Sequence, residues 1–276
     1  MSDVARIFLR KTNCTPTDNM AFIGRPPLNI ETKEIHISVV FTYDIPEAEE
    51  IYKFCEKIAP TKIGGPAFNL PSGEFIPGMY VEHGYTITSR GCPNRCWFCS
   101  VWKREPRLIE LPIHNGYNVL DDNLLACSED HIRKVFAMLK TQKPNPIEFT
   151  GGLEAKRLKP WHVDLLWDIR PKQIFFAYDT LDDLEPLVCA GKILHYANFT
   201  RNSLRCYVLD GYPGDTLLKA EKRMYEAWVA GFMPMSMLWK NENGDINEEW
   251  REFHRLWSRP AAIKSMIKMN FRKIIS

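Results

Sequence analysis

The sequence predicts an α/β protein in which a partial six-stranded parallel (β/α)6 barrel follows a small N-terminal αβ subdomain. Six short apolar segments recur from residue 85 onward, and helical patterns separate most of them. Repeated strand–helix units favour a parallel sheet covered by helices. Six units suit an open barrel that binds its ligands at the carboxyl ends of the strands. A doubly wound sheet remains the alternative, because spacing alone does not separate the two folds.

Three domains follow from this pattern. We expect the αβ subdomain to span residues 1–80, the barrel to span residues 81–245, and a helical extension to span residues 246–276. The length of 276 residues is ample for a sizeable hydrophobic core.

The N-terminal subdomain is expected to contain a sheet of three strands and one helix. Residues 5–10 and 35–41 are rich in β-branched and aromatic side chains, which is typical of strands. Residues 45–58 have Pro46 in the first turn and acids close to the start, which is typical of a helix. Residues 62–66, with the sequence Lys-Ile-Gly-Gly-Pro, predict a third short strand that ends in a turn.

The barrel strands are expected wherever an apolar run ends in turn residues. In chain order they are residues 85–90, 117–121, 147–151, 173–178, 205–210 and 234–239. The clearest helices between them are residues 129–139 and 216–230, and Gly231 is a typical stop for the second. Residues 100–116 have no regular pattern, so they form a functional loop or conceal a helix.

Composition excludes several classes of function. The 36 basic and 34 acidic residues nearly balance, so the overall charge gives no reason to expect nucleic acid. No stretch approaches the roughly 18 apolar residues that span a bilayer, and the N-terminus lacks the layout of a signal peptide. We therefore expect a cytoplasmic monomer without membrane contact. Residues 260–276 carry basic side chains and no acids, which predicts an amphipathic helix that packs on the barrel or touches RNA.

Three of the eight cysteines form a compact motif. Cys92, Cys96 and Cys99 give the spacing Cys-x3-Cys-x2-Cys directly after the first barrel strand. Random placement would produce this spacing about 0.007 times per chain, so it indicates a metal site. Soft thiolates select iron–sulfur clusters, zinc or copper(I). Three ligands leave one iron of a four-iron cluster open, which favours catalysis, whereas zinc completed by Cys127 or His114 is the alternative.

The motif, with aromatic Phe98 just before the third cysteine, resembles the signature of the radical-SAM superfamily. The resemblance covers residues 85 to about 240. It implies that Cys92, Cys96 and Cys99 hold a [4Fe–4S] cluster whose open iron is chelated by S-adenosylmethionine, with Phe98 near the adenine. It also implies that an electron from a reductant such as flavodoxin or ferredoxin releases methionine and a 5′-deoxyadenosyl radical, which abstracts hydrogen from a substrate.

Strand ends further along the chain resemble other parts of the family pattern. Asp121 and Asp122 lie in an Asp-Asp-Asn sequence similar to that of the branch that often carries a cobalamin domain, where a carboxylate would bind the ammonium group of S-adenosylmethionine. The alternative is a helix N-cap and turn before residue 129. Gly151, Gly152 and Glu154 resemble the family's Gly-Gly-Glu motif, although one residue separates the glycines from the glutamate. These residues therefore contact S-adenosylmethionine or substrate, or form an ordinary turn.

The fourth and fifth strands end in further candidates. Asp179 would bind the ribose or carboxylate of S-adenosylmethionine, or would cap the next helix. Gly211 would permit close approach beside the adenine. Cys206 and Tyr207 are candidates for a radical relay on their chemistry alone. The N-terminal unit resembles a shortened cobalamin domain without the Asp-x-His-x-x-Gly motif, so we expect no bound cobalamin.

The leading prediction is a radical-SAM enzyme whose substrate, a small molecule, peptide or RNA, is unidentified. The alternative outside the enzymes is a non-catalytic module that binds an iron–sulfur cluster or zinc. Methylation or methylthiolation of RNA is an alternative within the enzyme class. The missing second cysteine cluster weakens methylthiolation, and the basic C-terminal segment keeps an RNA substrate open.

Overall fold

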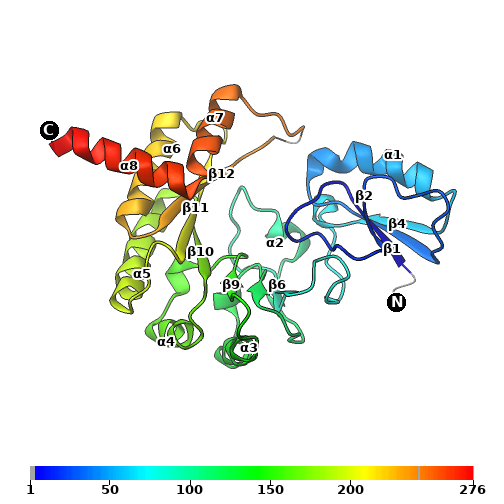
Figure 1. Cartoon of the computed structure of the whole chain (residues 1–276), viewed down its shortest axis with the longest axis horizontal. Coiled ribbons are helices and arrows are strands. Elements are labelled where there is room, and N and C mark those ends of the chain that lie inside the picture. The colour runs from blue at the N-terminus through cyan, green and yellow to red at the C-terminus, as the bar shows by residue number, and fades with distance from the viewer. Residues whose placement is uncertain (1–3, 242, 276) are drawn as a thin grey trace. The chain divides into compact units, whose positions relative to one another are not determined.

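The structure is a computed structural model, and it describes residues 4–241 and 243–275 (Figure 1). The chain divides into two compact units, Met1–Gln142 and Lys143–Ser276. The domain boundaries expected near residues 80 and 245 remain predictions.

The first unit begins with a sheet of four parallel strands in the order β2-β1-β3-β4. These strands are β1 (Val4–Phe8), β2 (Ala21–Ile23), β3 (Glu34–Ser38) and β4 (Thr61–Gly64). Three strands were expected, so the prediction was wrong by one. Strand β2 has only three residues, which is too short to show the alternation that identifies a strand.

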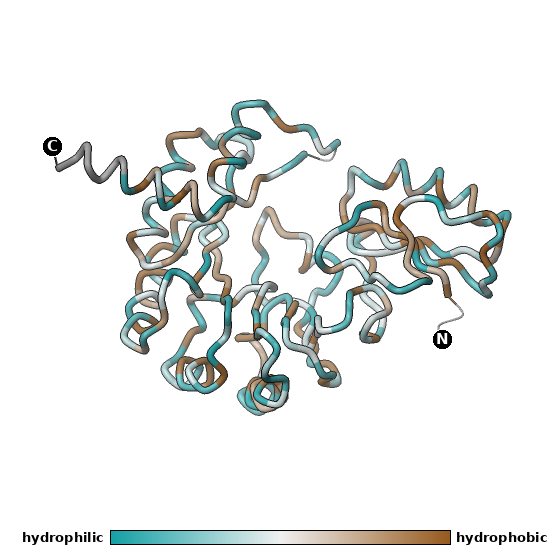
Figure 2. Tube along the Cα trace, viewed as in Figure 1, coloured by the Kyte–Doolittle hydropathy of each residue, from teal (hydrophilic) through white to brown (hydrophobic). Residues whose placement is uncertain are grey.

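Helix α1 (Ile45–Cys55) covers one face of this sheet (Figure 1). It follows the 3₁₀ turn Thr42–Asp44. Hydrophilic and hydrophobic residues alternate along it (Figure 2), and it buries Ala48, Ile51 and Cys55. The sheet supplies the other half of this core through Ala5, Ile7, Ile35, Ile37 and Val39. Apolar burial on this scale is the main favourable contribution to folding.

The remainder of the first unit starts with two short strands where one was expected. Strand β5 (Tyr85–Thr86) pairs with β8 (Asn118–Val119) in parallel, whereas β6 (Ser89–Arg90) pairs antiparallel with β7 (Ile109–Glu110). The single strand predicted over residues 85–90 was therefore wrong. The chain breaks because the Thr88 N–H donates to the Asp121 carboxylate instead of to a neighbouring strand.

Two helices complete the first unit. Helix α2 (Val101–Arg104) lies in the irregular stretch 100–116, which therefore does contain a short helix. Helix α3 (Glu129–Thr141) follows the 3₁₀ turn Leu124–Ala126. The hydroxyl of Ser128 accepts the N–H of His131 and so caps α3, as expected of serine at this position.

The second unit alternates parallel strands with helices. Its strands are β9 (Glu148–Phe149), β10 (Gln173–Tyr178), β11 (Leu204–Asp210) and β12 (Met233–Leu238). Its helices are α4 (Pro160–Ile169), α5 (Leu184–Tyr196), α6 (Leu217–Val229), α7 (Glu248–Trp257) and α8 (Pro260–Ile275). One six-stranded sheet has the order β12-β11-β10-β9-β8-β5. The expected α/β class with six parallel strands is confirmed.

The C-terminal segment forms the helix that its composition predicts. Within α8, Ile263 and Ile267 are buried, and the Lys264 Nζ donates to Asn202 Oδ1 at 3.0 Å. The apolar side of α8 is therefore packed within the second unit, while contact of its basic side with RNA remains a prediction. In the described part of the chain, no helix combines the length and the apolar character needed to span a membrane.

Candidate functional site

The three motif cysteines lie on one loop between β6 and α2. Gly91 opens the loop with φ +83°, and a Cβ atom there would lie 2.1 Å from the Arg107 carbonyl oxygen, so only glycine fits. Near the other end, the Cys99 N–H donates to the Cys96 carbonyl oxygen at 3.1 Å, and the Trp102 indole donates to the same oxygen at 3.0 Å. The loop is thus fixed on both sides of the motif.

All three cysteines are partly exposed, and none forms a disulfide with another described residue. Burial raises the pKa of the Cys99 thiol, and the charge of nearby Cys92 raises it further. The side-chain amide of Asn123 donates to the Cys92 Sγ at 3.2 Å. Among the described residues, no group of three or more His, Cys, Asp or Glu side chains is placed to hold a metal ion. The structure thus brings the cysteines to one loop without gathering their sulfur atoms around a single point.

Asp121 holds the segment that leads into the cysteine loop. Its carboxylate is 1% exposed and accepts the Thr88 N–H at 2.6 Å, the Thr88 hydroxyl at 2.6 Å and the Ser89 hydroxyl at 2.8 Å. Burial raises the pKa of Asp121, and these hydrogen bonds oppose the rise. The three donors occupy both carboxylate oxygens of Asp121.

Asp122 holds the start of the loop itself. Its carboxylate accepts the Gly91 N–H at 2.9 Å and an Arg104 N–H at 3.2 Å. Together with Asn123 on Cys92, the Asp-Asp-Asn sequence therefore contacts the cysteine loop or its approach through all three side chains. The alternative that this sequence caps a helix was wrong, because Ser128 caps α3 and Asn123 makes no capping bond to the 3₁₀ turn.

Phe98 is partly buried and packs edge-on against Trp97, with 5.4 Å between ring centroids. The Trp97 side chain is 57% exposed. An exposed aromatic pair beside the thiols offers a flat apolar surface on which a planar ring could stack.

The Gly-Gly sequence after β9 forms a turn in the second unit. Gly152 has φ +91°, which favours glycine. Gly151 is exposed. Glu154 follows in extended backbone, and its carboxylate accepts the Arg157 Nε–H at 2.6 Å. Whether these residues bind S-adenosylmethionine or substrate remains a prediction.

Asp179 follows β10, and its carboxylate accepts the Leu209 N–H at 3.2 Å. Burial, with the nearby Asp183 carboxylate, raises the pKa of Asp179 to about 7. The alternative that Asp179 caps the next helix was wrong. The side chain of Asp183 and the backbone of Thr180 form the cap of the 3₁₀ turn that leads into α5.

Three further candidates lie on strand β11 or directly after it. Gly211 has φ +74°, and a Cβ atom there would lie 2.7 Å from the Leu238 side chain. Cys206 is fully buried, which raises the pKa of its thiol, and the Sγ donates to the Tyr207 carbonyl oxygen at 3.5 Å. The Tyr207 ring stacks on Phe175 with centroids 4.6 Å apart. A relay role for Cys206 and Tyr207 remains a prediction.

Sequence reasoning missed Asp210, the last residue of β11. Its side chain is 0% exposed, and in the described part of the chain neither carboxylate oxygen accepts a well-aligned hydrogen bond, although the Ser236 hydroxyl lies near enough to oppose the rise in its pKa. Burial and the nearby Asp215 raise the pKa of Asp210 to about 7. The available signal was its place at the carboxyl end of a parallel strand, where ligand-binding residues concentrate.

The charge on Asp210 should make stability depend on pH. Its carboxyl group titrates near pH 7 in the folded chain and near 3.9 when unfolded. The folded state thus binds more protons between these values, and its stability falls as pH rises from about 4 to about 7. We expect Asp210→Asn to flatten this fall and to add on the order of 2 kcal/mol to the free energy of unfolding at pH 8.

Urea unfolding at pH 5 and pH 8 measures this difference. Asp182→Asn is the control, because Asp182 is exposed on the same unit and should leave the profile unchanged. A profile for Asp210→Asn that runs parallel to that of the wild type would contradict the assignment.

Comparison with known proteins gave no relative from which a function could be inferred. No protein-family model matches the chain, and no curated protein matches it either. The functional argument therefore depends on the residues of this chain.

Proposed function

We propose that this chain is a radical-SAM enzyme, with a [4Fe–4S] cluster on Cys92, Cys96 and Cys99 and a radical-SAM barrel built from the six-stranded sheet. The observation that carries the proposal is the Cys-x3-Cys-x2-Cys loop with three partly exposed cysteines outside any disulfide among the described residues, supported by Asp121, Asp122 and Asn123. When bound, the cluster supplies the electron that cleaves S-adenosylmethionine to methionine and a 5′-deoxyadenosyl radical.

The three cysteines are chemically suited to hold this cluster. Three thiolates are soft ligands of the kind that iron–sulfur clusters take. The sulfur atoms are not gathered in the structure, so binding requires the loop to draw them together. Pro93 and Arg95 are exposed between the first two cysteines, and exposed loop backbone changes conformation at low cost. Gly91 and the Cys96–Cys99 turn would then anchor the loop.

The neighbouring side chains have supporting roles in this proposal. Asn123 donates to the Cys92 sulfur and would hold that side chain in place. Asp122 and Arg104 hold the start of the loop through the Gly91 N–H and a shared ion pair. Phe98 would pack beside the adenine of S-adenosylmethionine. Gly152, Glu154, Asp179 and Gly211 are the proposed further contacts of S-adenosylmethionine or substrate, and flavodoxin or ferredoxin is the proposed electron donor.

The decisive test is formation of 5′-deoxyadenosine. The chain is reconstituted anaerobically with iron and sulfide, reduced with dithionite in the presence of S-adenosylmethionine, and assayed by liquid chromatography. The control is the same chain loaded with zinc, which fills thiolate sites but transfers no electron. We expect 5′-deoxyadenosine from the iron–sulfur form and none from the zinc form.

The other outcomes overturn the proposal. A bound cluster that never cleaves S-adenosylmethionine would assign the chain to the non-catalytic binding modules. Tight binding of zinc together with failure to assemble a cluster would replace the iron–sulfur centre by a zinc site.

A further inference from the structure

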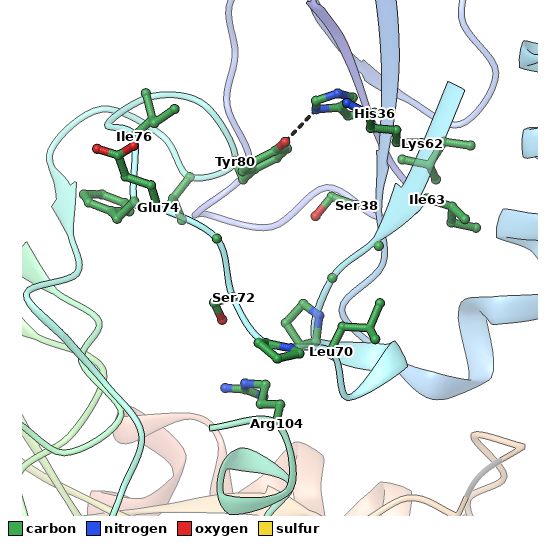
Figure 3. A pocket seen from close by; sticks show the side chains of 18 of the residues that line it. His36, Ser38, Lys62, Ile63, Leu70, Ser72, Glu74, Ile76, Tyr80 and Arg104 are labelled. Carbon is green, nitrogen blue, oxygen red and sulfur yellow. Dashed lines mark hydrogen bonds between the residues drawn. The ribbon is translucent and has the colours of Figure 1, made fainter. Parts of the chain in front are cut away.

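A cavity with a volume of about 340 Å³ lies beside the N-terminal sheet in the first unit (Figure 3). The carboxyl ends of β3 and β4 line it, together with residues 70–76. Gly65 sits where these elements meet, and a Cβ atom there would lie 2.4 Å from the Val39 carbonyl oxygen. The volume lies at the small end of the range for small-molecule sites.

The charged side chains that line the cavity are mostly basic. They are His36, Lys62, Arg90 and Arg104, and Glu74 is the one acid among the lining residues. Lys62 pairs with Glu34 at 2.5 Å, and Arg104 pairs with Asp122 at 3.2 Å. Figure 3 shows Arg104 on the opposite side of the cavity from the hydrogen-bonded His36 and Tyr80.

Among the basic residues of the cavity, Arg90 has a guanidinium group that no described carboxylate pairs with. In the part of the chain that the structure describes, its side chain makes no hydrogen bond or ion pair, and its Nε is buried. Asp121, Asp122 and Glu105 attract it electrostatically. Their carboxylates, however, already accept hydrogen bonds from other donors, including the Ser72 N–H on Glu105 at 2.5 Å.

An unpaired, largely buried guanidinium costs free energy, because it has given up water without gaining an acceptor. The Arg104 Nε is likewise buried without a partner. Buried polar groups without partners are few in folded proteins, and functional sites are where such departures are expected. Two guanidiniums with unused donors beside one cavity match the geometry of a phosphate or carboxylate, which guanidinium groups bind through paired hydrogen bonds.

Much of the remaining wall is apolar. Ile63, Leu70, Phe75 and Ile76 line the cavity, and the last three come from the segment 70–76. Leu70 and Ile76 are more than half exposed, so this wall leaves apolar surface for a ligand to cover. A ligand that fits both the two guanidinium groups and the apolar wall has one anionic group and an apolar body.

We propose that this cavity binds a small anionic molecule, a phosphate ester or a carboxylate, through Arg90 and Arg104, and that this molecule is the substrate. Its assignment as substrate rests on the proposed function, because Arg104 also pairs with Asp122, which holds Gly91 immediately before Cys92. The anionic group would therefore anchor the substrate close to the cysteine loop.

The test uses the 276-residue chain without iron, sulfide or S-adenosylmethionine. Thermal unfolding is followed with phenyl phosphate, with benzoate and with neutral benzyl alcohol, at constant ionic strength and pH. A ligand that binds only the folded state raises the unfolding midpoint. We expect phenyl phosphate or benzoate to raise it and benzyl alcohol not to, and the active anion identifies the phosphate or carboxylate class.

Variants assign the effect to the cavity. Arg90→Met and Arg104→Met should abolish the anion-dependent shift. Arg205→Met is the matched control, because Arg205 also has a buried nitrogen without a partner but lies in the second unit outside the cavity; it should keep the full shift. Without anion, Arg90→Met should unfold at the same temperature as the wild type or higher.

Equal shifts in all variants, or no shift with either anion, would overturn the proposal. The result also separates this proposal from the enzyme assignment. Anion binding without 5′-deoxyadenosine formation would keep the cavity and remove the radical chemistry. 5′-Deoxyadenosine formation without anion binding would keep the enzyme and remove this cavity as its substrate site.

Discussion

Replacing Cys92, Cys96 or Cys99 singly by alanine should abolish cluster assembly and with it all formation of 5′-deoxyadenosine. Each thiol supplies one of only three protein ligands in the proposed site, so two remaining thiolates leave a second iron without a ligand. Iron and acid-labile sulfide per chain, with the visible absorbance after anaerobic reconstitution, measure the loss.

The matched control is Cys189→Ala. Cys189 is a free, exposed cysteine on α5, outside the motif. It tests whether reconstitution loads iron on any accessible thiol. Retention of full cluster content by a motif variant, or equal loss in Cys189→Ala, would refute the assignment of ligands.

Asp121→Ala should lower the free energy of unfolding by about 3 kcal/mol, since three hydrogen bonds to a buried carboxylate are lost together. The Thr88 N–H and the hydroxyls of Thr88 and Ser89 would be left in a buried space without an acceptor. Urea unfolding followed by circular dichroism measures the change.

Asp130→Ala is the control for this variant. Asp130 is exposed on α3 and pairs with Lys134 across one helical turn, so its removal should cost less than about 0.5 kcal/mol. A loss for Asp121→Ala no larger than that of Asp130→Ala would show that the buried carboxylate does not hold this segment.

The strands of the second unit were predictable from the sequence to within a residue or two. The range 173–178 coincides with β10, and 205–210 differs from β11 only at Leu204. Each is a run of apolar and β-branched residues that ends at a turn, so local preference and tertiary burial favour the same structure. Helix α6 was as clear, because Thr216 caps its start and Gly231 follows its end with φ +103°.

The break after β5 was not predictable, because its cause lies far along the chain. The apolar and β-branched residues from Tyr85 to Arg90 favour one strand, yet the structure has two. Thr88 leaves the sheet to bind Asp121, 33 residues away. Preference within a short window carries no information about such a partner.

The candidate site was likewise predictable only in part. Spacing alone was enough to propose the three cysteines as ligands, because they are close in sequence. The support that Asp122 gives to Gly91 joins residues 31 apart, and the cavity beside Arg90 forms from six separate stretches of the chain. The sequence marks such residues as polar or charged, but their partners follow only from the folded chain.

The core of the N-terminal sheet has a consequence for the order in which the chain folds during synthesis. Every residue assigned to that core lies between Ala5 and Phe68, so translation completes it before Cys92 leaves the ribosome. Domains generally fold from the N-terminus as they emerge. The sheet can therefore fold while the cysteines are still inside the ribosome, and any metal would reach the thiols only after this part of the chain has folded.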